Sequence, residues 1–105
     1  MNKEIQKKLT KNWFKTFQDM ICEDIQKIEG KNKKFVITKW LRNKKKDEGG
    51  GEYRILKGGK IFDKVGVNFS EVYGKFSKQY RNKIPGTKYS PNFWASGISI
   101  VMHMK

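Results

Sequence analysis

The first 29 residues carry hydrophobic positions with a helical period. The apolar residues recur at steps of three and four along one stripe: Phe14, Phe17, Ile21, Ile25 and Ile28, widened by Trp13 and Met20. This period predicts one amphipathic helix over 3–29. Asn2 suits the N-cap, Lys27 lies in the last turn and Gly30 suits the C′ position. Because strand-like segments follow, we expect the stripe to pack on a sheet; the lysine-rich opposite face leaves a membrane-surface helix as the alternative.

Segments of period two follow and predict strands. The segment KFVITKWLR (34–42) has two faces, one with Phe35, Ile37 and Leu41 and the other with Val36 and Trp40. The next segment, NKKKDEGGG (43–51), does not alternate and predicts a charged loop. Alternation returns in 65–73, where one face carries Val65, Val67, Phe69 and Tyr73 and the other carries Asn68 and Ser70.

The pair Gly58-Gly59 lies between two strand-like runs and predicts a two-residue hairpin turn with one of these glycines at positive φ. Pairing outward from this turn places Arg54 opposite Asp63, and this pair of opposite charges supports the register. Next to the turn Lys57 falls opposite Lys60, and the two apolar pairs, Leu56 with Ile61 and Ile55 with Phe62, alternate faces. One face of the hairpin is therefore expected to join the core, and the other to need a cover such as a second subunit.

Glycine is frequent throughout this part of the chain, with seven glycines in 49–74. A phosphate-binding loop would need the spacing GxGxxG or GxxxxGK[ST] at the start of a helix. Neither spacing occurs. We therefore predict that the glycines serve turns between strands and bind no phosphate.

The last quarter of the chain combines a turn signal and a final strand. The segment KFSKQYRNK (75–83) predicts a short helix ended by Pro85-Gly86. The segment FWASGISIVMHMK (93–105) predicts a strand. Its core face is expected to carry Ile98, Ile100 and Met102, and its other face Gly97, Ser99, Val101 and His103.

Composition places these elements in one folded domain. The chain has 105 residues, 36% of them hydrophobic and 13% aromatic, which is too aromatic for a disordered tail. We predict an α+β fold, an antiparallel sheet with the N-terminal helix packed on it. The lone cysteine, Cys22, allows no internal disulfide and suits a reducing compartment. The sequence contains no run of eighteen apolar residues, so no membrane span is predicted. Its first residues do not form a secretory signal.

The charge of the chain is strongly basic. Its 24 basic and 10 acidic residues give a formal net charge of +14, and 21 of the basic residues are lysines. Scattered lysines are typical of a solvated surface. They also create a field that attracts anions, either nucleic acid or a small polycarboxylate. Charge alone leaves these three interpretations open.

Side-chain chemistry gathers at one place, the face of the final strand that carries Ser99 and His103. Four residues of strand separate the two side chains by roughly 13 Å. They are therefore too far apart to act as a nucleophile and its base, or to bind one metal ion together. They could contact separate parts of one large ligand, although a lone histidine on a strand is more often a structural group.

Two stretches carry a resemblance to a known family. GGGEYRILKGGKIFDKVGVNFSEVYG (49–74) resembles the signature of the oxygen-dependent coproporphyrinogen III oxidases, with Val65 where that family usually has alanine. FWASGISIVMH (93–103) resembles a second motif of the same family. The match is long and ordered, and covers at least 49–103.

The resemblance implies an enzyme of haem synthesis, cytoplasmic in bacteria. It converts two propionates of coproporphyrinogen III to vinyl groups with dioxygen as co-substrate, giving protoporphyrinogen IX. The implied fold is a large antiparallel sheet covered by helices on both sides, in a homodimer, with no nucleic acid as partner. No organic cofactor is implied, and manganese has been described for bacterial members.

The resemblance also implies roles for individual residues. Ser99 matches a serine that contacts substrate, and His103 matches a histidine assigned to a metal. The hairpin linked to dimerisation in that family matches Ile55, Leu56, Lys57, Gly58, Gly59, Lys60, Ile61, Phe62, Asp63 and Lys64.

One departure from the family lies after His103. The family continues there with a strand that carries His-x-Asn-x-Arg and holds the proton donor, and this sequence ends at Lys105. We therefore expect 1–105 to be the N-terminal portion of one incomplete oxidase domain, with no catalytic residue and no activity alone. The alternatives are a small basic nucleic-acid-binding module, whose binding would weaken steeply with salt, and a non-catalytic fragment that associates through its sheet edges.

Overall fold

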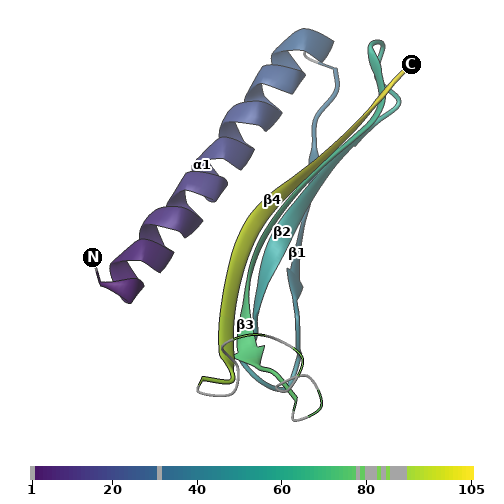
Figure 1. The fold of residues 1–105 in the computed structure, drawn as a ribbon. Helices are drawn as coiled ribbons and strands as arrows, with labels where there is room; N and C mark the ends of the chain where they lie inside the picture. Colours follow the sequence, from purple (N-terminus) through teal and green to yellow (C-terminus); the bar gives the residue numbers. More distant parts are fainter. Residues whose placement is uncertain (1, 31, 78, 80–82, 84, 86–89) are drawn as a thin grey trace.

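A computed structural model describes residues 2–30, 32–77, 79, 83, 85 and 90–105. Its elements follow the chain as α1 (Lys3–Glu29), β1 (Val36–Leu41), β2 (Gly49–Lys57), β3 (Phe62–Lys75) and β4 (Asn92–Met104). The four strands form one antiparallel sheet in the order β1-β2-β3-β4. Helix α1 lies along one face of this sheet (Figure 1). The predicted α+β class is confirmed, and no described element covers the other face, which we call the open face.

Helix α1 begins and ends where its capping residues predicted. The side chain of Asn2 accepts a hydrogen bond from the backbone N–H of Glu4 at 2.7 Å, which satisfies one of the free donors of the first turn. At the other end Gly30 has φ of 97° and donates its N–H to the carbonyl of Gln26. Only glycine adopts this conformation without strain, so the helix ends there.

The buried face of α1 differs from the predicted stripe. The helix buries Gln18, Cys22, Ile25 and Glu29, whereas Trp13, Met20 and Ile28 are more than half exposed. Gln18 can lie at the centre of the interface because its amide donates to two sheet carbonyls, those of Glu52 at 2.9 Å and Val67 at 3.3 Å. Ile21 and Ile25 of the predicted stripe do pack in the core. A buried polar group with partners carries little cost, so hydrophobicity alone identified the buried face only in part.

The hydrophobic core lies between α1 and the central strands. It consists of Cys22, Ile25, Leu56, Phe62, Val65 and Val67, with Ile21, Phe35, Ile98 and Ile100 packed around it. The alternation predicted for β3 and β4 is thus confirmed at these positions. Met102, predicted in the core, is 43% exposed because it lies near the end of β4.

The glycine triplet was predicted as part of a loop, and this prediction is wrong. Strand β2 begins at Gly49, and all three glycines pair with β3. A methyl group at Gly51 would overlap the carbonyl oxygen of Phe69 and lie 2.7 Å from the ring of Trp40. These positions need glycine because neighbouring backbone and the indole ring fill the space of a side chain.

The predicted register of the hairpin is also wrong. The structure pairs Arg54 with Val67 rather than Asp63. The turn is centred on Lys60 and Ile61, because the N–H of Gly59 bonds to the carbonyl of Phe62 at 2.9 Å. Partners move by an even number of residues, from 63 to 67, so the side chains of the regular ladder keep their predicted faces. Phe62 is the exception: it was predicted on the face of Ile55 but lies in the core beside Leu56.

The reason for this register lies in a contact from the helix. The carboxylate of Glu29 accepts three backbone N–H groups of the turn, from Lys60 at 2.8 Å, Ile61 at 2.9 Å and Phe62 at 2.6 Å. The prediction of a glycine at positive φ is confirmed, since Gly58 has φ of +66°. The carboxylate of Glu29 on α1 therefore organises the turn. Turn propensities depend on the local sequence and cannot reveal a contact with a distant helix.

Two smaller features complete the strands. The pairing of β3 with β4 shifts between Phe62 and Lys64, and this irregularity lets the ring of Phe62 join the core. The short helix predicted over 75–83 begins with a residue, Lys75, that belongs to β3. Phe76 and Ser77 are not helical, and residues 78 and 80–82 of that prediction lie outside the described residues.

Candidate functional site

Side chains from all four strands form rows across the open face. One row contains Thr38, Tyr53, Asn68 and Ser99, which are successive partners in the antiparallel pairing. The next row contains Val36, Ile55, Gly66 and Val101. A third row contains Lys57, Lys64 and His103. Directly opposed side chains lie about 5 Å apart at Cβ, so each row presents its groups together.

These rows line a hollow of about 650 Å3. Ser99 and His103 both lie in its lining, with Ile98 and Ile100 packed against the core on the other side of β4. The structure therefore places the two residues on the face that their alternation predicted. What each of them binds stays a prediction.

Gly66 lines the hollow, and a second glycine, Gly97, lies on the same face of β4 as Ser99. A Cβ atom built at Gly66 or at Gly97 would meet no heavy atom within 4 Å. Neither glycine is therefore required by packing within the described residues. Glycine in a strand interior often marks a place where a ligand or another chain approaches the backbone closely.

One wall of the hollow is held by a hydrogen bond that the sequence did not reveal. The indole Nε1 of Trp40 donates to the side-chain oxygen of Asn68 at 3.2 Å. The ring lies against Gly51, where a side chain would displace it. Alternation placed Trp40 on this face, but only the pairing of β1 with β2 and β3 brings it to Asn68.

A second hollow of about 450 Å3 continues the first and shares Tyr53 and Ile55 with it. Three lysines line it, Lys33, Lys34 and Lys57. We call the two hollows together the trough, and call Lys33, Lys34, Lys57 and Lys64 its lysine end. No aspartate or glutamate is among the described residues that line either hollow.

Within the part of the chain that the structure describes, the surroundings of His103 do not fit a metal ion. Its partner across the β3–β4 pairing is Lys64, which places an ammonium group in the same row. Among the described residues, no three histidine, cysteine, aspartate or glutamate side chains gather to hold a metal. A cation site needs anionic or neutral donors in number, and this row supplies one imidazole beside lysines.

The helix side of the sheet carries an ionic cluster. Glu52 contacts Lys15 at 2.7 Å and Arg54 at 2.8 Å, and Arg54 also contacts Asp19 at 2.7 Å. Burial by itself raises the pKa of Glu52, but the hydrogen bonds from Lys15 and Arg54 outweigh it and lower the pKa. Burial likewise raises the pKa of the Cys22 thiol, against a smaller opposing effect of Arg54. These groups are mutually satisfied, so the cluster is structural.

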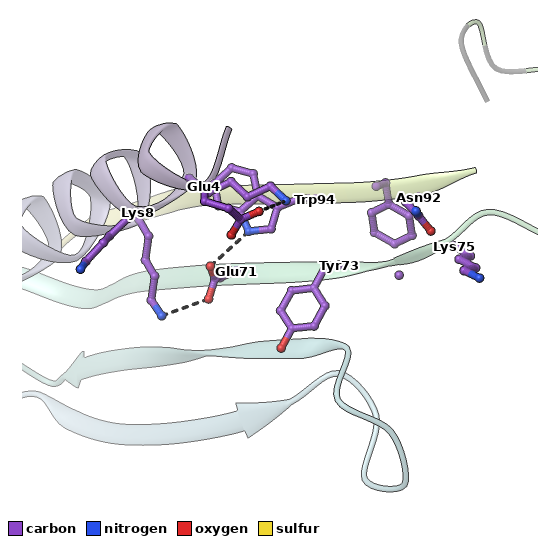
Figure 2. Close-up of a pocket in the computed structure, with 11 residues that line it drawn as sticks. Glu4, Lys8, Glu71, Tyr73, Lys75, Asn92 and Trp94 are labelled. Carbon is purple, nitrogen blue, oxygen red and sulfur yellow. Dashed lines mark hydrogen bonds and ion pairs between the residues drawn. The ribbon is translucent and has the colours of Figure 1, made fainter. Parts of the chain in front are cut away.

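A further hollow, about 700 Å3, lies between the first turns of α1 and the ends of β3 and β4. Figure 2 shows Glu71 at its centre, facing Trp94. Glu71 accepts the indole N–H of Trp94 at 3.1 Å and pairs with Lys11 at 3.1 Å. The other acidic residue of this hollow, Glu4, pairs with Lys7 at 3.4 Å, so both carboxylates are already paired within the chain.

The helix itself is not a membrane span. Within the described part of the chain, no helix combines the length and the apolar character needed to cross a bilayer. Helix α1 instead rests on the sheet, as the preferred interpretation of its pattern predicted.

Comparison with known proteins gives a consistent result. The family model described as "Coproporphyrinogen III oxidase" matches residues 9–105. The oxygen-dependent coproporphyrinogen-III oxidase of Rickettsia akari (strain Hartford) is 43% identical over 107 residues, covering 94% of this chain and 37% of the relative. The protein of the same name from Rickettsia bellii (strain RML369-C) is 42% identical over 113 residues, covering 100% of this chain and 39% of the relative. The chain thus spans less than two-fifths of the length of these relatives.

Proposed function

The chain belongs to the coproporphyrinogen III oxidase family, and on that premise we propose that its open face binds coproporphyrinogen III for oxidative decarboxylation. In this reaction each reacting propionate loses CO2 and a hydride equivalent and becomes a vinyl group; dioxygen takes up the hydride and a proton to give hydrogen peroxide. The proposal places the reaction in the cytoplasm, in an enzyme of the relatives' length. It routes no step through a metal, because the row around His103 does not fit one.

The observation that carries this proposal is the chemistry of the trough. Coproporphyrinogen III is a large, apolar macrocycle with four carboxylates. The trough offers an apolar floor with glycine at Gly66, lysines at one end, and no acidic residue among its described lining. A carboxylate ligand therefore finds cations and hydrogen-bond donors there without repulsion from a fixed negative charge.

Replacing Ser99 by alanine is expected to weaken binding of coproporphyrin III, the stable oxidised form of the substrate. The hydroxyl lies in the hollow and can donate one hydrogen bond to a carboxylate. Its loss should cost about 1 kcal/mol, which corresponds to roughly a fivefold rise in Kd. Quenching of tryptophan fluorescence during titration of the porphyrin measures this Kd.

The matched control is Ser96→Ala on the same strand. The Ser96 hydroxyl donates to the carbonyl of Ser70 at 2.8 Å, and Ser96 does not line the trough. This variant should leave the Kd unchanged. Equal weakening by both substitutions would show that the effect is structural and would remove Ser99 from the binding site.

We further propose that the hairpin over 55–64 joins two copies of the chain. Ile61 at the tip of the turn is 38% exposed, and Tyr53 on the open face near the hairpin is equally exposed. Replacing Ile61 by aspartate should shift a dimer toward monomer by at least tenfold in dissociation constant, since a charge would be buried in an apolar contact. Analytical ultracentrifugation measures this. An unchanged dimer would assign the interface to another surface.

A further inference from the structure

The trough is chemically asymmetric along the strands. At one end it presents the neutral polar side chains of Asn68 and Ser99, beside the indole of Trp40, whose N–H is donated to Asn68. At the other end it presents the lysine end, together with His103. Four residues of strand separate Ser99 from His103, roughly 13 Å, a distance on the scale of a tetrapyrrole macrocycle.

The lysine end is built from three segments that the fold brings together. Lys57 on β2 is paired with Lys64 on β3. The connection between α1 and β1 adds Lys33, whose ammonium group would lie 3.5 Å from a Cβ atom at Gly58. Like charges placed side by side repel one another, so an anion bound between them relieves that repulsion.

We propose that the substrate binds in one orientation, with its two retained propionates at the lysine end and its two reacting propionates near Ser99 and Asn68. This inference rests on the proposed function of the open face and adds the direction in which the substrate lies.

The physical reason lies in the charge of the leaving group. A reacting carboxylate becomes neutral CO2, so its negative charge leaves the carboxylate oxygens as the carbon–carbon bond breaks. An ammonium group held against it would stabilise the starting state more than the transition state and slow the reaction. A neutral donor such as Ser99 also orients the carboxylate, but it stabilises the starting state less and therefore slows the reaction less. Lysines are therefore better placed against carboxylates that are to remain.

The test compares two stable porphyrins that differ in the reacting groups. Coproporphyrin III carries all four propionates, and protoporphyrin IX carries only the two retained ones. The double variant Lys57→Met/Lys64→Met of the 105-residue chain should bind both porphyrins about tenfold more weakly, since each exposed ion pair contributes modestly. Ser99→Ala should weaken binding of coproporphyrin III and leave that of protoporphyrin IX unchanged.

The control is Lys8→Met/Lys39→Met, which removes the same charge from residues outside the trough. It should change either Kd by less than twofold, and circular dichroism should show that both double variants are folded. If Lys57→Met/Lys64→Met weakens the binding of coproporphyrin III alone, the orientation is the reverse of the one proposed. If it weakens the binding of neither porphyrin, the lysines have no role in binding. Both results leave the proposed function standing. Failure of the unmodified chain to bind either porphyrin would overturn the proposed function and the orientation together.

Discussion

Replacing Gly59 by alanine should lower the free energy of unfolding by about 2 kcal/mol, the usual cost of forcing a methyl group into a filled site. A Cβ atom at this position would lie 2.5 Å from both carboxylate oxygens of Glu29. The carboxylate would have to move, and the turn N–H groups of Lys60, Ile61 and Phe62 would lose their acceptor. For a domain of this size the midpoint of thermal unfolding should fall by about 10 °C, as measured by circular dichroism.

The matched control is Gly66→Ala in the middle of β3. A Cβ atom there meets no heavy atom within 4 Å, so the free energy of unfolding should stay within about 0.5 kcal/mol of the original value. The two substitutions add the same methyl group and differ only in the space available. Similar midpoints for both variants would contradict the contact between Glu29 and the turn.

Acid should unfold the chain through the same contact. The N–H of Phe62 is the main cause that lowers the pKa of Glu29 below its ordinary value of 4.5, against a smaller effect of burial, and Lys60 and Ile61 lower it further. A carboxyl group whose pKa is lowered by folding stabilises the folded state above its unfolded pKa. This stabilisation is lost as the pH falls from about 4.5 through the pKa of the folded state. Unfolding in urea at a series of pH values measures the loss.

Glu29→Gln should be less stable than the original chain at pH 7 and should lose less stability between pH 7 and the acid range. Some dependence on pH should remain, because the pKa of Glu52 is also lowered in the folded state. Glu23→Gln, at an exposed position of α1, should keep the original profile. A Glu29→Gln profile parallel to that of the original chain would show that the turn does not depend on this carboxylate.

Both predictions concern a contact between segments about 30 residues apart, and the sequence did not reveal it. Glu29 is the last residue of α1, where a surface carboxylate would be ordinary. Gly58 and Gly59 by themselves favour a two-residue turn. The structure instead centres the turn on Lys60 and Ile61, because the carboxylate from the helix satisfies three N–H groups there.

Sequence reasoning predicted the residues of the candidate site along a single strand but not the residues that other strands bring beside them. Alternation along β4 placed Ser99 and His103 on one face, and the resemblance singled out the same two residues. Trp40 and Lys64 were not selected as site residues. Their contribution depends on the pairing of Trp40 with Gly51 and of Lys64 with His103, which joins distant segments.

The sequence by itself determined the properties that depend on neighbours along the chain. The ends of α1 follow from the caps at Asn2 and Gly30, the faces of β3 and β4 follow from period two, and the family follows from two dense motifs. Only the tertiary structure decided the buried face of α1, the turn register and the asymmetry of the trough. Those properties depend on hydrogen bonds and charges supplied by segments far away in sequence, and no local pattern of hydrophobic residues records such partners.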